Sequence, residues 1–144
     1  MQLPTKCRYG TRAMIEIARH YNKGPVKRKE ISKNQNISSA YLENILISLK
    51  ANKLIRTTRG ANGGFALDKP PGAISLLQIV TILEGSISPV ECLENHALCE
   101  KADVCAARKA WGKLYNAQKA ALAGVTLQDL LDMDGAGNAG DYSI

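Results

Sequence analysis

The sequence predicts a mainly α-helical protein with a small β-hairpin wing: a winged helix-turn-helix followed by a long dimerisation helix. Three observations support this fold class. Apolar residues recur at helical spacing in several segments, a glycine-rich turn joins two extended segments after the third of them, and basic residues are concentrated in the first half of the chain. The composition, 45% hydrophobic and only 5% aromatic, is typical of a soluble helix-rich chain.

The first three helices are predicted from their apolar spacing and their boundaries. An amphipathic helix is expected from Thr5 to Tyr21 and a second, short helix from Lys27 to Asn34. A third is expected from Ser39 to Asn52, with Ser38 or Ser39 as its N-cap, because a serine hydroxyl can accept an unpaired amide proton there. The apolar stripe of this third helix is expected in the core.

The opposite face of the third helix begins with polar residues that suit contact with DNA. They are Ser38, Ser39, Tyr41 and Glu43. Small polar side chains at a helix start can approach base edges closely, and tyrosine can donate to a phosphate or a base. The pattern predicts a helix-turn-helix. The alternative is a generic three-helix bundle whose polar residues are merely solvated.

A predicted β-hairpin follows the third helix directly. Its strands are expected at Leu54–Thr58 and Gly64–Leu67, joined by the glycine-rich turn Arg59–Gly64. A hairpin in this place is a wing, and Arg59 at its tip could enter a minor groove, where negative potential is concentrated. A phosphate-binding loop is excluded because no Gly-Lys-Ser/Thr follows the glycines.

The charge of the chain is divided unequally between its halves. Residues 1–70 carry fourteen basic and four acidic residues, a net charge of +10, whereas residues 71–144 carry five basic and nine acidic residues, a net charge of −4. The first half is therefore suited to a polyanion such as double-stranded DNA. A basic face that only favours solubility is the alternative.

The chain divides into four predicted regions. Residues 1–85 form the winged DNA-binding domain with a supporting apolar helix, and residues 86–105 form a cysteine-containing loop. Residues 103–133 hold the long dimerisation helix (Asp103 to Ala123) and a short C-terminal helix (Leu127 to Met133), and residues 134–144 form a disordered tail.

The long helix carries an apolar stripe around Trp111, which predicts a twofold dimer. Packing of Trp111 within its own subunit is the alternative. No apolar run is long enough for a membrane span and no signal peptide is visible, so a cytoplasmic protein with no membrane partner is expected.

Three cysteines in the loop are candidate metal ligands. Cys92, Cys99 and Cys105 are separated by six and then five residues. Thiolates are soft ligands that suit an iron-sulfur cluster or zinc, and both centres normally take four protein ligands, so the set is incomplete. Unligated thiols on a loop are the alternative.

Three segments, MQLPTKCRYGTRAM, SSAYLENIL and RGANGGFAL, resemble the Rrf2 family of bacterial winged-helix regulators, and the resemblance extends from Met1 to about Asp132. It implies a homodimer that binds a palindromic operator. It also implies that Ser38, Ser39, Tyr41 and Glu43 lie at the major groove and Arg59 in the minor groove.

The resemblance further implies that the three cysteines hold a two-iron two-sulfur cluster, as in the family's iron-sulfur regulators. Two departures from their best-known pattern are visible. The first cysteine spacing is one residue longer, and Arg108 stands where that pattern has a histidine. The fourth ligand is therefore open among His96, Glu43 and Cys7, and a set with His96 suits zinc equally well.

The function implied is a transcriptional repressor whose operator binding depends on an iron-sulfur cluster and which controls cluster assembly genes. A sensor of nitric oxide or redox stress, and a DNA-binding protein with structural zinc, are the alternatives. A thiol redox enzyme or a protein-interaction adaptor is a third class. No Cys-x-x-Cys pair or catalytic histidine pattern is present, so no enzyme and no catalytic residues are expected.

Overall fold

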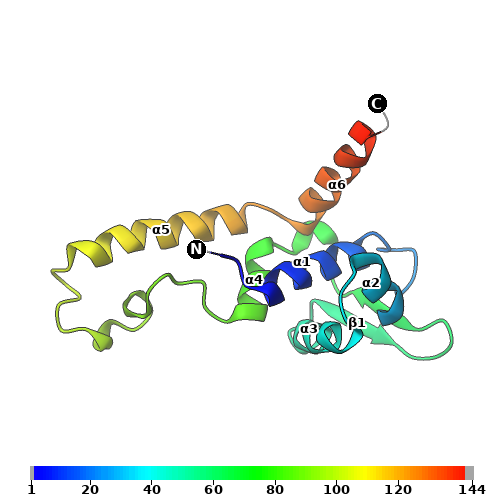
Figure 1. Cartoon of the computed structure of the whole chain (residues 1–144), viewed down its shortest axis with the longest axis horizontal. Coiled ribbons are helices and arrows are strands. Elements are labelled where there is room, and N and C mark those ends of the chain that lie inside the picture. The colour runs from blue at the N-terminus through cyan, green and yellow to red at the C-terminus, as the bar shows by residue number, and fades with distance from the viewer. Residues whose placement is uncertain (1, 142–144) are drawn as a thin grey trace.

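The computed structural model describes residues 2–141, which form a winged body with a projecting arm (Figure 1). We call residues 2–85 together with the last helix the winged body, and residues 86–123 the arm. The helices and strands are, in chain order, α1 (Thr5–Ala18), α2 (Arg28–Gln35), α3 (Ser39–Ala51), β1 (Ile55–Thr58), β2 (Gly64–Leu67), α4 (Leu76–Glu84), α5 (Ala106–Ala123) and α6 (Leu127–Asp141). Short 3-10 helices lie at Pro71–Ala73 (η1), Glu91–Leu93 (η2) and His96–Leu98 (η3). None of the described helices combines the length and the apolar character needed to cross a bilayer.

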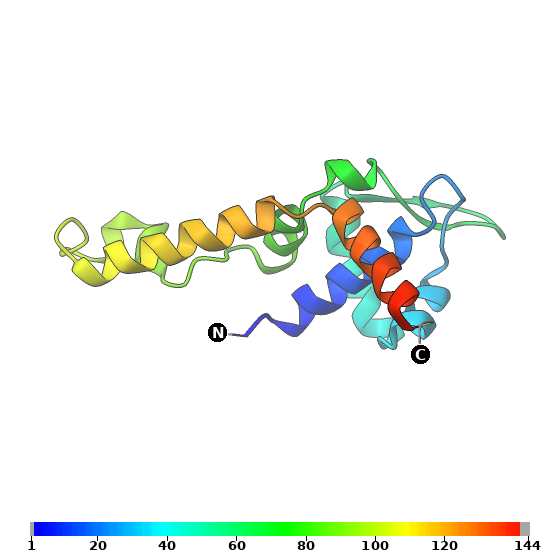
Figure 2. The same cartoon turned by 90° about the horizontal axis from the view of Figure 1, so that it is seen from above.

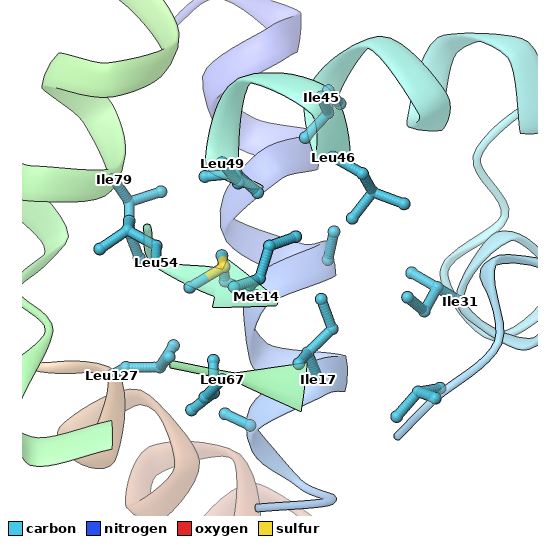
Figure 3. Close-up of a cluster of buried hydrophobic side chains, with 14 of the residues drawn as sticks. Met14, Ile17, Ile31, Ile45, Leu46, Leu49, Leu54, Leu67, Ile79 and Leu127 are labelled. Carbon is cyan, nitrogen blue, oxygen red and sulfur yellow. The ribbon is translucent and has the colours of Figure 1, made fainter. Parts of the chain in front are cut away.

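Helix α1 is the centre of the winged body. It packs against α2, α3, α4 and α6, and its residues Ala13, Met14 and Ile17 are at most 1% exposed. Figure 3 shows Met14 and Ile17 among apolar side chains from the surrounding elements. Each fully buried large apolar side chain of this kind stabilises the fold by about 1.5–3 kcal/mol relative to exposure.

A close approach of α1 and α4 requires a glycine at position 10. A Cβ atom added to Gly10 would lie 2.1 Å from Cδ1 of Leu83, well inside van der Waals contact. Because Gly10 has no side chain, Leu83 can pack directly onto the α1 backbone. The supporting helix α4 is thereby held against the same helix that carries α2 and α3.

The turn between α2 and α3 has the geometry of a helix-turn-helix. Asn36 adopts a left-handed conformation with φ of 53°, which ends α2. Ile37 is buried beneath the turn, and the hydroxyl of Ser38 accepts a hydrogen bond from the amide of Tyr41 at 3.3 Å. Ser38 rather than Ser39 is thus the N-cap of the recognition helix α3.

The hairpin is attached to the body at its base. Strands β1 and β2 are antiparallel, with Ile55 opposite Leu67, and both of these side chains are buried. Farther along β2, the backbone of Phe65 exchanges two hydrogen bonds with that of Val26, at 2.7 and 2.8 Å. The wing is therefore fixed both to the core and to the segment that precedes α2.

A buried carboxylate joins α1 to the end of α2. Glu16 is 3% exposed, and its oxygens accept hydrogen bonds from Asn34 at 2.8 Å, from Gln35 at 2.8 Å and from Arg19 at 2.6 Å. Burial alone would raise the pKa of Glu16, but these donors outweigh it and hold the pKa below its ordinary value of 4.5. The charged carboxylate consequently fixes the residues that lead into the turn before α3.

The arm leaves the winged body after α4 and returns through α5 (Figure 2). Residues 86–105 form the cysteine loop, which runs alongside α5. None of the residues of α5 is buried in this single chain. The chain before α4 and the chain after α5 meet in the winged body, because Ser75 and Thr126 form a β-bridge and the amide of Leu127 donates to the carbonyl of Ile74 at 2.8 Å.

The end of the chain differs from the sequence expectation. We expected a short helix ending at Met133 and a disordered tail over residues 134–144, but α6 continues to Asp141. Its start is fixed by reciprocal hydrogen bonds between Thr126 and Asp129, and Asp134 forms an ion pair with Arg19, the C-cap residue of α1. These contacts stabilise a helix that its glycine content disfavours. Residues 142–144 lie outside the described part of the chain.

Two other boundaries shift by a few residues. Helix α1 ends at Ala18 rather than Tyr21, and a turn follows in which Asn22 has a positive φ. Helix α5 begins at Ala106 rather than Asp103, because Cys105 is its N-cap and accepts from the amide of Arg108.

Replacing Glu16 with glutamine tests the buried carboxylate. Glu16→Gln should lower the free energy of unfolding by about 1–3 kcal/mol at pH 7, because an amide nitrogen would face donors that need an acceptor. Since the folded-state pKa is lowered, the stabilisation is present above pH 4.5 and is lost as the pH falls through the folded-state value. The difference between wild type and variant, measured by urea unfolding, should therefore shrink below that pH. A matched Glu91→Gln change on the exposed loop should have no effect, and equal behaviour of the two variants would disprove the role of Glu16.

Candidate nucleic-acid interface

The leading end of α3 presents the polar residues predicted to meet DNA. Ser38, Ser39 and Glu43 are exposed, as is Arg59 in the turn of the hairpin. Tyr41 is half-buried, since its ring packs edge-on against the ring of Tyr9 with centroids 5.8 Å apart. The structure therefore places Ser38, Ser39 and Glu43 on the accessible face of the recognition helix and Tyr41 at its edge.

Basic residues of α1 border the same edge. The guanidinium groups of Arg8 and Arg12 lie 5.9 and 5.4 Å from the centre of the Tyr9 ring. Arg12 also donates to the side chain of Gln35 at the end of α2, at 3.2 Å. A cationic surface thus continues from α1 onto the helix-turn-helix.

Glu43 has a basic partner from a different helix. Nη1 of Arg28, at the start of α2, lies 3.1 Å from Oε1 of Glu43. Arg28 also lines a hollow of about 420 Å³ together with Lys29, Ser32, Ser39 and Phe65. Arg28 could not be identified from the sequence, because nothing there indicates that residues fifteen positions apart are paired across two helices.

Ile47 is a second residue that the sequence analysis missed. It lies one helical turn after Glu43 and is 60% exposed, although most large apolar residues of α3 are buried. The sequence could have indicated its exposure, because Ile47 does not fit the 3–4 residue spacing of the buried apolar residues of α3. An exposed aliphatic side chain on this face is suited to contact with a thymine methyl group.

The hairpin is held beside α3 by a backbone contact that excludes a side chain. A Cβ atom added to Gly64 would lie 2.4 Å from the carbonyl oxygen of Val26. This approach allows Phe65 to pair with Val26, and it fixes the direction in which the hairpin leaves the body. The position of Arg59 relative to α3 depends on this pairing.

The cysteine loop places its thiols in different surroundings. Cys92 lies in η2 and is half-buried, Cys99 is exposed, and Cys105 is half-buried at the start of α5. Arg108, which stands where a histidine was expected from the resemblance, donates from Nε to the carbonyl of Cys92 at 3.2 Å. Arg108 therefore links η2 to the first turn of α5 and supplies no ligand, since a guanidinium has no lone pair to donate.

Over the described residues, no three or more histidine, cysteine, aspartate or glutamate side chains gather closely enough to hold a metal ion. Nε2 of His96 instead forms a hydrogen bond of 2.8 Å with Oδ1 of Asp103. The more distant candidate ligands lie in the winged body. Cys7 is buried in α1, where burial and then the nearby Glu84 raise the pKa of its thiol, and Glu43 is paired with Arg28.

Comparison with known proteins identifies the family. Residues 3–133 match the family Rrf2, described as an iron-dependent transcriptional regulator. The chain belongs to the Rrf2 family of transcriptional regulators. It is thus a regulator of a DNA-binding class and not an enzyme.

Several relatives match nearly the whole chain. The transcriptional regulator CymR of Bacillus subtilis is 39% identical over 130 residues, which cover 90% of this chain and 89% of CymR. The transcriptional regulator IscR of Yersinia enterocolitica is 33% identical over 132 residues, which cover 92% of this chain and 80% of IscR.

Solved structures of such regulators have the same fold. The structure of CymR, the global cysteine regulator of B. subtilis, superimposes with a TM-score of 0.78 at 38% identity, and the match covers 92% of this chain and 98% of that one. IscR of T. potens gives a TM-score of 0.79 at 31% identity, covering 93% and 88%. The predicted family and the predicted winged-helix fold class are therefore confirmed.

Substitution of Gly64 tests how the wing is attached. Gly64→Ala should lower the free energy of unfolding by about 1–3 kcal/mol, because the new methyl group would overlap the Val26 carbonyl. Urea unfolding measures this loss. Gly72→Ala is the matched control, since a Cβ atom there would meet open space. Equal stability of the two variants would contradict the close contact between β2 and Val26.

Proposed function

We propose that this chain is a homodimeric repressor that binds a palindromic operator and whose DNA affinity is modulated by an iron-sulfur cluster in the cysteine loop. The observation that carries the proposal is the joint exposure of the α3 leading end and the Arg59 turn on the half of the chain with a net charge of +10. A polar helix end beside a basic hairpin suits simultaneous contact with two grooves.

Each predicted contact residue has a distinct role at the operator. Ser38 and Ser39 approach base edges or phosphates, and Tyr41 donates to the DNA backbone from the edge of the helix. Glu43 accepts from a base amino group in the major groove, and Arg59 enters the adjacent minor groove. Ser38 can still donate its hydroxyl proton, because in capping α3 it acts only as an acceptor.

Dimerisation through α5 supports the palindromic operator. Helix α5 has no buried residue, and its apolar stripe includes Trp111, which is 46% exposed. A second copy packed against this stripe by a twofold axis would remove it from water and would place two recognition helices symmetrically.

A charge placed in the α5 stripe should separate the dimer. Trp111→Glu should convert the protein to a monomer in sedimentation velocity, because an ionised carboxylate would be buried at the interface. Asn116→Glu is the matched control, since it adds the same charge on the opposite, exposed face of α5. A dimeric Trp111→Glu protein would exclude α5 as the interface.

The donor chemistry of the loop fits an iron-sulfur cluster held by Cys92, Cys99 and Cys105. Within residues 86–105, Ala102 is the only buried residue, so the exposed Cys99 can approach the other two thiols without unpacking the core. When bound, the cluster would supply a centre that reacts with oxidants and nitric oxide. The natural regulatory targets of such a protein are genes of cluster assembly.

His96 is the best local candidate for the fourth ligand. Its Nε2 is bonded to the Asp103 carboxylate, an arrangement that orients a histidine ring and leaves Nδ1 for a metal. Arg108 cannot take this role, as its side chain is a donor bound to the carbonyl of Cys92. Cys7 and Glu43, which lie in the winged body, are the other candidates.

Metal analysis of protein purified without oxygen tests the proposal. Iron and acid-labile sulfide in equal amounts are expected, both lost in Cys99→Ser, together with a change in operator affinity between the loaded and the metal-free protein. Thr81→Ser, on the exposed side of α4, is a matched control that should keep the cluster. Stoichiometric zinc in colourless protein would instead assign the loop a structural role, and equal DNA affinity in both states would refute the switch.

A further inference from the structure

We infer that Arg28 sets the base specificity of Glu43: its guanidinium pairs with Glu43 in the free protein and transfers to a DNA phosphate when Glu43 finds a base that can donate to it. The inference rests on the proposed docking of α3 in the major groove. It assigns to α2 a part in sequence discrimination.

The geometry places Arg28 where both partners can be reached. Its side chain is 42% exposed and that of Glu43 is 55% exposed, with 3.1 Å between the paired atoms. Arg28 lines two adjoining hollows, one shared with Lys29 and Ser39 and the other with Glu43 and Ile47. It therefore lies between the start of α2 and the exposed face of α3.

An exposed ion pair of this kind is weak and is readily exchanged for a better one. A phosphate is such a partner, since the planar guanidinium can donate two parallel hydrogen bonds to its oxygens. The exchange leaves the Glu43 carboxylate without a cation. It is favourable where a base amino group, that of cytosine above all, donates to Glu43, because an unpaired carboxylate facing DNA is repelled by the phosphates.

At a site without that cytosine, Arg28 stays on Glu43 and neutralises it. The ion pair then reduces the loss of DNA affinity at such a site, so the wild-type protein tolerates other bases at this position. Removal of Arg28 should consequently have two effects at once. Affinity falls because a phosphate contact is lost, while discrimination in favour of cytosine rises because the wrong sites now face an unneutralised carboxylate.

Lys29 is the matched control for Arg28. It is the next residue in the first turn of α2, carries the same charge and borders the first hollow, but it does not line the hollow that contains Glu43. Lys29→Ala should therefore weaken binding by the same factor for every sequence. Lys50 also borders the Glu43 hollow, and it remains unchanged in all the variants compared.

The experiment selects operator sequences from a randomised DNA duplex library with the wild-type protein, and then measures affinities for the selected site and its single-base variants. The proteins compared are the wild type, Arg28→Ala, Glu43→Gln, the double variant and Lys29→Ala. Arg28→Ala should bind the selected site about fivefold more weakly and raise the cytosine-to-thymine affinity ratio at one position per half-site by about threefold or more. Glu43→Gln should abolish that preference.

The double variant tests the exchange itself. In the Glu43→Gln background Arg28 has no ion pair to give up, so removing it should weaken binding to the selected site by a larger factor than in the wild type. Additive effects, or an Arg28→Ala protein with the same base preferences as Lys29→Ala, would overturn the inference while the proposed function stands. A folded wild-type protein that selects no sequence would overturn both.

Discussion

The orientation of the recognition helix depends on one buried charge. Glu16 accepts hydrogen bonds from two side chains in the last turn of α2, and it does so from α1, the helix around which the core is built. A carboxylate removed from water must be satisfied, so its donors are held firmly in place. Arg19 extends this network to Asp134 of α6. The turn before α3 is thus joined to the C-terminal helix by charged groups rather than by apolar packing alone.

Individual helices and the hairpin were predictable because they depend on the spacing of apolar residues and glycines within short segments of the chain. The apolar periodicity gave α1 and α3, and the glycines between two extended segments gave the hairpin. Contacts between distant residues were not predictable in this way. The Arg28–Glu43 pair joins two consecutive helices, and the Arg19–Asp134 pair joins residues 115 positions apart. The second pair helps to extend α6 into the segment that was expected to be a disordered tail. Ser38, Ser39 and Glu43 are exposed as expected, whereas Tyr41 is half-buried, and the DNA contacts and the cluster ligands stay predictions.

Two arginines have roles that the sequence did not predict: Arg28 in the winged body and Arg108 in the arm. Arg28 places a cation beside Glu43, the one acid on the leading face of α3, so the charge of that face depends on whether the two residues are paired. Arg108 occupies the position of an expected ligand and fastens the cysteine loop to α5 through a carbonyl of Cys92. A further tie comes from Glu94, which accepts from Tyr115 of α5 at 3.0 Å and from Ser86 at 2.7 Å. The loop is therefore anchored at several points although almost none of it is buried.

The β-bridge between Ser75 and Thr126 has a consequence for how this architecture can vary. It brings together the residues that precede α4 and those that follow α5, and Leu127 completes the core immediately afterwards. The β-bridge thus closes a loop that contains α4 and the arm, and both ends of this loop are joined at the winged body. Lengthening this loop adds little to the entropic cost of closing it. The same body can accordingly carry arms of different length and ligand chemistry over evolutionary time without altering the packing that supports its recognition helix.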